Sequence, residues 1–362
     1  MLRAGPSIVI DVDDQTTQQI HADISGQDDN LGDSALRRGY LSAIAGAGRR
    51  FHVVGRMQTS DYLSGLALSE QHIWYADRDT WVRSVDAKSK IIHVFNAGEI
   101  DLAGVVRYPT PRRADELAAA KDSGGVVIAA GIGLKDPRLA RSIEFRSSFL
   151  NADVVSWRDA GSQQAAGFGE VNPDWAFMLG SKTADWRSVG ARSYIAVTLR
   201  FDRPYPDSRW IAAVKSLANA TSTRIVTLAQ VSRDAPRAVQ LAVDLGGEYL
   251  APRSLAHDVL EAHVRGIYQQ SLAVVSDRAH GLIIGATEGA YPIGSGADPG
   301  KIVRLLDAVG LGTLIGHFDQ LQDFGEQLPT RLRDLAPAVD EARARLARLT
   351  LRIQAVLGSV MP

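Results

Sequence analysis

Short apolar segments alternate along the chain with longer segments in which apolar residues recur every three or four positions. The short segments have the length and composition of strands buried on both faces of a parallel sheet. The longer ones have the period of amphipathic helices, as in residues 34–45, where Leu36, Tyr40 and Ile44 share one face. This order is typical of a doubly wound α/β fold. In the first half it predicts strands at residues 20–25, 51–55, 91–95, 126–130 and 154–157.

The pattern is interrupted by a region rich in Gly, Ser and Pro, residues 161–190, and then begins again. Two Rossmann-like domains facing a cleft are the simplest architecture for such a repeat, an N-terminal one in residues 1–180 and a C-terminal one in residues 181–325. The predicted elements of the second half are strands at residues 194–199, 224–229, 248–251, 272–276 and 290–293, and helices that include residues 207–220 and 236–245.

Residues 326–362 have a third pattern, in which apolar positions are spaced alternately by four and three. This spacing predicts one long C-terminal amphipathic helix. Apolar stripes of this kind usually pack on the core of their own chain, whereas a homodimer interface and a membrane-surface contact are the alternatives. The stripe consists of Leu335, Val339, Ala342, Leu346, Leu349, Ile353 and Val356.

The amino-acid composition excludes several classes of protein function. With 40 Lys and Arg against 41 Asp and Glu, the formal net charge of −1 gives no general basic field, so we expect no nucleic-acid partner. The absence of cysteine excludes disulfides and thiolate chemistry. Asp11, Asp13 and Asp14 interrupt the first apolar run, unlike a signal peptide, and no apolar run approaches the roughly 20 residues of a membrane span. We expect a cytoplasmic protein, with contact at the inner face of the membrane as an alternative.

The first candidate binding segment is GQDDNLGDSALRRG, residues 26–39, directly after the first strand. Its glycines permit close backbone approach, and the free amides at the start of the helix can receive an anion or a sugar hydroxyl, which makes Asn30 and Gly32 candidate binding residues. Asp33 falls in the first helical turn, where it either contacts a substrate or only complements the helix dipole. The segment lacks the GxGxxG pattern, so it does not predict a dinucleotide site.

Three further strand ends carry candidate residues. Two are glycine loops, with Asn96 and Gly98 in one and Gly131 and Gly133 in the other, although tight turns also use glycine. At the third, Arg158 either clamps a carboxylate or phosphate, or pairs with Asp159 or a helix end.

The segment VVSDRAHGLIIGATEG, residues 274–289, runs from a buried strand through polar residues into an apolar helix. Open α/β sheets build binding sites at such strand ends. A lone histidine there is more often structural than catalytic, but Arg278, His280 and the downstream Lys301 would place two cations and a proton carrier on one domain edge. We find no metal-binding helix motif and no GxSxG nucleophile elbow, and we expect no metal.

Four of these segments, in order, resemble the polysaccharide pyruvyl transferase family: NLGDSA, SWRDAGS, PDWAF and DRAHG followed by Lys. The resemblance covers most of residues 20–316. Departures are the glycine-rich strand end, here Ala-Ala-Gly-Ile-Gly, and the long C-terminal helix. Members of the family transfer pyruvate from phosphoenolpyruvate to a sugar as a ketal and resemble GT-B glycosyltransferases in fold.

The resemblance implies a GT-B-like enzyme of exopolysaccharide or cell-envelope biosynthesis, with the acceptor on the N-terminal domain and the donor on the C-terminal domain. Asp33, Arg158, His280 and Lys301 fall on the family's functional positions. Arg158 and Lys301 would hold phosphoenolpyruvate, supported by Arg200 or Arg278, His280 would act as general acid and base, and Asp33 would orient a hydroxyl of a lipid-linked or polymeric glycan. No cofactor is implied.

Two alternatives remain open at this point. A GT-B nucleotide-sugar glycosyltransferase would share the fold and would need a carboxylate for the ribose, for which Glu288 is the candidate. A noncatalytic glycan-binding member would have lost the charged set, which this sequence retains.

Overall fold

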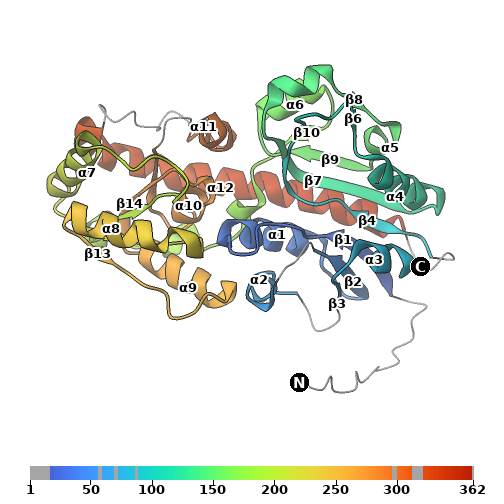
Figure 1. The fold of residues 1–362 in the computed structure, drawn as a ribbon, viewed down its shortest axis with the longest axis horizontal. Helices are drawn as coiled ribbons and strands as arrows, with labels where there is room; N and C mark the ends of the chain where they lie inside the picture. The colour runs from blue at the N-terminus through green and yellow to red at the C-terminus, as the bar shows by residue number, and fades with distance from the viewer. Residues whose placement is uncertain are drawn as a thin grey trace.

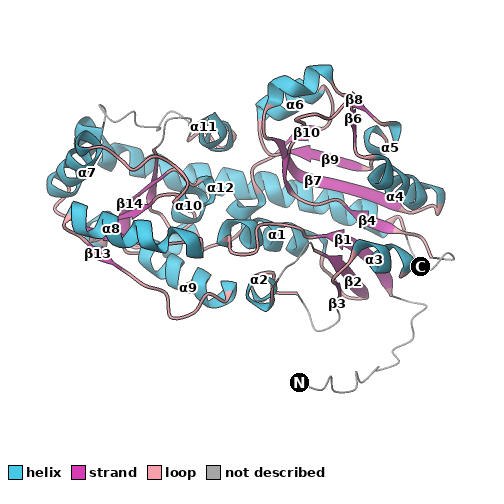
Figure 2. Ribbon diagram, viewed as in Figure 1, coloured by secondary structure: helices cyan, strands magenta, loops and turns pink. Residues whose placement is uncertain are grey.

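The computed structural model describes residues 17–55, 59–68, 72–85, 89–295, 300–311 and 321–360, with the side chains of residues 321–324 left out. The N-terminal acidic segment and residues 296–299, the glycine-rich stretch before Lys301, lie outside the described residues. The chain forms two α/β domains, each built on a parallel sheet with helices on its faces (Figures 1 and 2). The architecture expected from the alternating pattern, two Rossmann-like domains in a GT-B-like arrangement, is confirmed.

The N-terminal sheet has eight strands in the order β10-β9-β7-β4-β1-β2-β3, and β5 pairs with the end of β7. All five predicted strands are present, and β3, β5 and β10 are additional strands too short to produce a readable period. A separate parallel pair, β6 (Arg107–Tyr108) and β8 (Glu144–Phe145), lies beside it. The sheet strands are β1 (Gln18–Asp23), β2 (Arg49–Val54), β3 (Ile73–Tyr75), β4 (Ile92–Val94), β5 (Gly98–Ile100), β7 (Val126–Leu134), β9 (Val154–Trp157) and β10 (Glu170–Val171).

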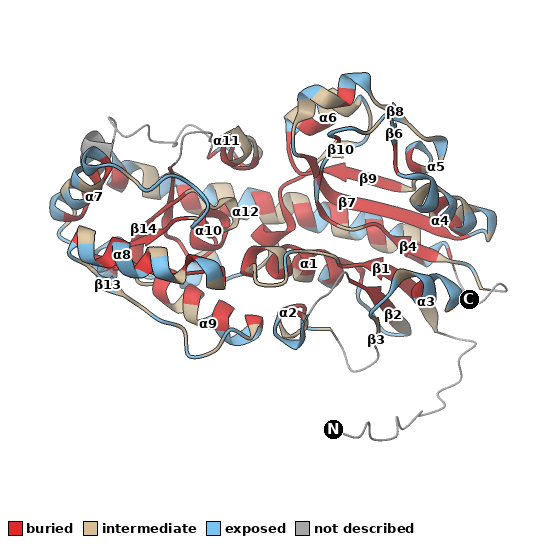
Figure 3. Cartoon of the chain, viewed as in Figure 1, coloured by how far each residue is buried: buried red, intermediate tan, exposed pale blue. Residues whose placement is uncertain are grey.

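Helices cover the N-terminal sheet because its central strands are apolar on both sides. All nine residues of β7 are buried, and the central strands form the buried layer of this domain in Figure 3. The helices are α1 (Leu31–Ile44), α2 (Ser60–Ser64), α3 (Arg78–Arg83), α4 (Pro111–Asp122), α5 (Ser147–Leu150) and α6 (Ala160–Ala166).

The C-terminal sheet has five parallel strands in the order β13-β12-β11-β14-β15. Every strand predicted for this half is present within one or two residues of its expected ends. The strands are β11 (Tyr194–Thr198), β12 (Arg224–Thr227), β13 (Glu248–Tyr249), β14 (Ser271–Ser276) and β15 (Tyr291–Gly294). The helices are α7 (Ser208–Ala220), α8 (Ala235–Leu245), α9 (His257–Tyr268), α10 (Ala279–Ala286) and α11 (Gly300–Asp307).

The long C-terminal helix α12 (Leu321–Gly358) lies across both domains (Figure 1). It packs on α7 and β15 of the C-terminal domain and on α1 and β7 of the N-terminal domain. Its apolar stripe is buried from Leu335 through Ile353, and in the last turn Leu357 is fully buried while Val356 is partly buried. The stripe therefore packs on its own chain, the first of the three expectations. No helix in the described ranges is both long and apolar enough to span a membrane.

The two domains share one hydrophobic core at their junction. The 3₁₀ turn η3 (Trp175–Met178) packs against α1, where a Cβ atom on Gly39 would lie 2.3 Å from the carbonyl oxygen of Trp175. Because no real Cβ makes so close a contact, Gly39 allows this turn to lie directly on α1. This 3₁₀ turn also positions Asp174, the residue that precedes it.

Candidate functional site

The loop before α1 joins the two domains. Asn30 caps the helix, with its Oδ1 accepting from the backbone N of Gly32 at 3.0 Å, and it also forms an isolated antiparallel bridge with Val231. Asp29 and Arg233 form a salt bridge at 2.6 Å across the same junction. Asn30, predicted as a binding residue, thus has a structural role as helix cap and domain contact.

His280 lies in the first turn of α10 and points at the N-terminal domain. Its Nε2 is 3.3 Å from Oδ2 of Asp174, and its side chain is 11% exposed. A Cβ on Gly32 would lie 2.4 Å from the Cβ of His280. Gly32 is therefore required for the start of α1 to approach His280, and the two predicted residues are brought together.

Asp174 is the residue that connects the histidine to a buried cation. It is fully buried, it accepts from the backbone N of Ala176 at 3.0 Å, and its Oδ2 lies 3.2 Å from Nη1 of Arg158. Burial alone would raise the pKa of this carboxyl, but His280 and Arg158 outweigh burial and hold the pKa well below its ordinary value. Asp174 is thus an ionised carboxylate shared by Arg158 and His280.

A second carboxylate, Glu99 on β5, links Arg158 to the C-terminal domain. Its oxygens lie 3.6 Å from Nη2 of Arg158 and 3.1 Å from Nζ of Lys301. Burial raises the pKa of Glu99, but Lys301 and Arg158 outweigh this effect and lower it overall. Burial and the charge of Arg158 lower the pKa of Lys301, against the opposing effect of Glu99.

The structure therefore brings together three of the four residues predicted to be catalytic, Arg158, His280 and Lys301. Arg158 pairs with neither Asp159 nor a helix end, the two structural interpretations. Asp159 instead caps α6 and lies 3.3 Å from Arg304 of α11.

Asp174 and Glu99 are not among the site residues predicted from the sequence. Asp174 stands in the PDWAF motif directly before a helical turn, and Glu99 directly follows the selected Gly98. Both carboxylates stand in sequence segments that were already recognised, one in a family motif and one beside a predicted glycine. Including every carboxylate of such segments among the candidates would have identified them.

Asp33 lies at the start of α1, with its side chain 23% exposed. Its Oδ2 accepts from the backbone N of Gln27 at 2.7 Å, and Oδ1 is 3.9 Å from Arg37. Asn96 contacts the same arginine. Its side chain accepts from Nε of Arg37 at 3.0 Å and donates to the carbonyl of Ser25 at 2.8 Å. Asn96, predicted as a binding residue, thus supports the loop that leads to α1 and Asp33.

The predicted glycines Gly98, Gly131 and Gly133 make space for neighbouring side chains of the site or adopt a backbone conformation that favours glycine. A Cβ on Gly131, which has a φ of +76°, would lie 2.3 Å from Cδ1 of Trp175. A Cβ on Gly133 would lie 2.7 Å from Nε of Arg158. Gly98 has a φ of +121°, a backbone conformation that favours glycine just before Glu99.

The two supporting arginines are engaged within their own domain. Arg278 forms a bidentate pair with Asp234, with Nη2 at 2.8 Å from Oδ1 and Nε on Oδ2. Arg200 forms a bidentate pair with Asp202 at 2.8 and 2.6 Å. Each of the two arginines therefore already has a carboxylate partner, and their support of the donor stays a prediction.

Glu288, the candidate for a nucleotide ribose, is unsuited to that role. Its side chain is fully buried, and Oε1 lies 2.7 Å from Arg265. Oε2 accepts from Ser181 at 2.6 Å and from Gln269 at 3.0 Å. Glu288 is thus enclosed inside the domain and bonded there to Arg265, Ser181 and Gln269.

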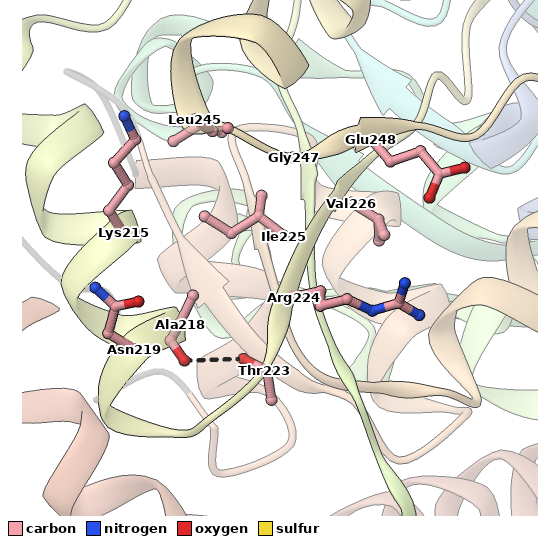
Figure 4. Close-up of a pocket in the computed structure, with 11 residues that line it drawn as sticks. Lys215, Ala218, Asn219, Thr223, Arg224, Ile225, Val226, Leu245, Gly247 and Glu248 are labelled. Carbon is pink, nitrogen blue, oxygen red and sulfur yellow. Dashed lines mark hydrogen bonds between the residues drawn. The ribbon is translucent and has the colours of Figure 1, made fainter.

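A cavity of about 460 Å³ lies at the other end of the C-terminal sheet, beside the starts of β12 and β13 (Figure 4). It is lined by residues that include Lys215, Asn219, Arg224 and Glu248. His280 follows the carboxyl end of β14, and the strands are parallel, so the cavity is at the opposite edge from the site. Within the described residues, no group of three or more His, Asp or Glu side chains is arranged to hold a metal ion.

The fold and site define a two-domain α/β protein whose charged centre is built from both domains. The model of the family described as polysaccharide pyruvyl transferase matches residues 29–295, and the chain belongs to that family. A comparison with curated proteins finds no match to this sequence.

Solved structures of several other proteins have a similar course of the chain. An O-GlcNAc transferase mutant from Thermobaculum terrenum is 14% identical, with 97% of this chain and 70% of that chain covered and a TM-score of 0.49. MnaA of S. aureus with UDP is 12% identical, with 88% and 91% covered and a TM-score of 0.49. An E. coli heptosyltransferase with ADP-2-deoxy-2-fluoro heptose is 15% identical, with 78% and 90% covered and a TM-score of 0.42. At these identities and scores the likeness does not bear on activity.

Proposed function

We propose that this protein transfers pyruvate from phosphoenolpyruvate to a sugar of a polysaccharide or glycolipid precursor of the cell envelope, forming a pyruvate ketal. The observation that carries the proposal is the chain of contacts from His280 through Asp174 and Arg158 to Glu99 and Lys301. It combines a proton carrier with two cations in a protein of the pyruvyl transferase family.

The donor requires the cations. Phosphoenolpyruvate carries a carboxylate and a phosphate on a three-carbon enol, so its site must supply positive charge locally in a chain whose net charge is −1. Arg158 offers a planar guanidinium suited to a bidentate contact, and Lys301 offers a half-exposed ammonium. These two groups would hold the anionic ends of the donor.

The reaction requires a group that gives and takes protons. Protonated His280 would transfer its proton to the methylene carbon of the donor, which becomes a methyl group and leaves a cationic centre at C2. One sugar hydroxyl then attacks C2 and returns a proton to the histidine. Asp174 faces Nε2 and would stabilise the charged imidazole during these steps.

Loss of phosphate completes the transfer. The bond between C2 and the phosphate oxygen breaks with its electron pair on oxygen, the second sugar hydroxyl attacks C2, and its proton leaves with the phosphate. Asp33, at the start of α1 next to the Gly32 contact with His280, would orient the attacking hydroxyl. Neither a metal nor a cofactor enters this scheme, and we place the reaction in the cytoplasm.

Phosphate release from phosphoenolpyruvate, measured with a panel of lipid-linked and aryl glycosides, tests the proposal. His280→Gln should lose about 100- to 10,000-fold in turnover while its affinity for the donor is nearly unchanged, because glutamine keeps a polar amide but does not titrate. Lys301→Ala should instead raise the Michaelis constant for phosphoenolpyruvate, because it removes a charge that holds the donor. Turnover near that of the wild type in His280→Gln would contradict the assignment.

Thermal stabilisation by ligands separates this proposal from a nucleotide-sugar glycosyltransferase. Phosphoenolpyruvate should raise the melting temperature, and UDP- and GDP-sugars should not, because only a ligand of the native state stabilises it. The opposite result would favour the glycosyltransferase. The burial of Glu288 supports the first outcome.

A further inference from the structure

Glu99 stands between two cations that belong to different domains. Arg158 follows β9 of the N-terminal domain, whereas Lys301 begins α11 of the C-terminal domain, and the carboxylate of Glu99 contacts both, at 3.6 and 3.1 Å. The exposed fraction rises along this line, from 3% for Arg158 to 30% for Glu99 and 41% for Lys301. The outer end of the chain of charges is therefore accessible to a ligand from solvent.

The two carboxylates next to Arg158 differ in how firmly they are held. Asp174 is fully buried and also accepts from the backbone N of Ala176, so it is a fixed part of the site. Glu99 is partly exposed, and the side-chain contacts described for it are with cations, Lys301 and Arg158. These are the groups that an incoming anion would also seek.

The charged groups of the site carry nearly equal numbers of positive and negative charges. Arg158, Lys301 and a protonated His280 carry three positive charges, while Asp174 and Glu99 carry two negative ones. An added carboxylate or phosphate would then have to share these cations with both carboxylates. Moving the carboxylate of Glu99 away would leave its two cations to the ligand.

We propose that Glu99 is an internal competitor of the donor, whose carboxylate occupies an anion position between Arg158 and Lys301 and leaves it when an anionic group binds. The identity of the anion, phosphoenolpyruvate, rests on the proposed function, but the competition itself depends only on the charges of the site. Glu99 would thereby set the affinity for the donor and favour an anion strong enough to displace it.

A domain latch is the competing explanation for the same contacts, and it predicts the opposite sign. If the Glu99–Lys301 pair mainly keeps the domains together, its removal should weaken donor binding. Other ion pairs also connect the domains, among them Arg304 with Asp159 at 3.3 Å and Arg233 with Asp29 at 2.6 Å. The latter is a matched control, because it joins the domains away from the two donor cations.

Calorimetric titration of the full chain with phosphoenolpyruvate and, separately, with inorganic phosphate tests the competitor. Glu99→Gln keeps the shape of the side chain and removes its charge, so the dissociation constant for phosphoenolpyruvate should fall by roughly two- to fivefold, the effect of losing a partly exposed ion pair. Asp29→Asn should leave it unchanged. An unchanged or larger dissociation constant in Glu99→Gln would overturn the competitor, and a larger one would support the latch.

A second variant covers the case in which Glu99→Gln does not fold. Glu99→Asp keeps the charge but shortens the side chain by one methylene, which withdraws the carboxylate from the cations and should also lower the dissociation constant. If neither the wild type nor the variants bind phosphoenolpyruvate but Glu99→Gln gains affinity for phosphate, the proposed function fails and the competitor stands. If all bind phosphoenolpyruvate equally, the competitor fails and the proposed function stands.

Discussion

Two of three neighbouring buried histidines, His21 and His93, predict that this protein loses stability in mild acid. His21, His52 and His93 lie at the same level of the neighbouring strands β1, β2 and β4, and the rings of His21 and His52 stack at 4.7 Å. Burial, together with the charges of His52 and His93, lowers the pKa of His21 to about 3. Burial lowers the pKa of His93 to about 4, while Glu116 and Arg78 act in opposite directions.

The sign follows from the protons that each state binds. In the unfolded chain both histidines have a pKa near 6.5, so below that pH the unfolded state binds protons that the folded state excludes, and stability falls as pH falls. A pH of 4.5 is about two units below the unfolded pKa of each histidine. The free energy of unfolding therefore falls by ~2.7 kcal/mol for each histidine and by about 5 kcal/mol for the two together. This is comparable to the whole stability of many domains, roughly 5 to 15 kcal/mol.

Urea unfolding followed by circular dichroism at pH 7.5 and 4.5 measures the effect. The free energy of unfolding of the wild type should be about 5 kcal/mol lower at pH 4.5, and His21→Leu should lose only about half as much between the two pH values. Ile92→Val, on the same sheet, should lower stability at both pH values and keep the pH dependence of the wild type. A His21→Leu protein with the full pH dependence would refute the assignment of this loss to His21.

Three further predictions follow from packing and charge. Leu346→Ala, in the buried stripe of α12, should lower the free energy of unfolding by about 2 to 5 kcal/mol, whereas unchanged stability with an altered sedimentation coefficient would indicate a subunit interface. Gly32→Ala places a methyl group against His280 and should reduce turnover with a normal circular dichroism spectrum; full turnover would contradict the close approach of α1 and α10. Asp174→Asn leaves buried Arg158 without its fixed partner and should cost about 3 to 5 kcal/mol in urea unfolding, which a melting curve equal to that of the wild type would disprove.

Periodicity was sufficient to predict most of the fold. The strand β7 is buried along its whole length, and its apolar run is visible in the sequence because no polar residue interrupts it. The stripe of α12 is equally visible because it continues for several turns. Strands such as β3 and β5, at three residues each, are too short for any period, so their places depend on neighbours that the sequence alone does not identify.

Charge partners were the least predictable part of the site. Arg278 appeared in the sequence as a free cation beside His280, but Asp234, 44 residues earlier, forms a bidentate pair with it. Glu99 and Lys301 are 202 residues apart, yet they form an ion pair. A sequence gives the sign of each charge but not its partner, and the partner decides whether that charge is available to a ligand.

The division of the site between two domains links its chemistry to their contact. Asp174, Arg158 and Glu99 belong to the N-terminal domain, whereas His280 and Lys301 come from α10 and α11 of the other domain. A rotation of one domain would therefore separate His280 from Asp174. Some of the contacts that oppose such a rotation lie outside the site, as in the bond from Nε2 of Gln354 on α12 to the carbonyl of Ala43 at 2.6 Å. Because α12 packs on both domains, the long C-terminal helix, which is not part of the family's motif pattern, helps to keep these charged residues together.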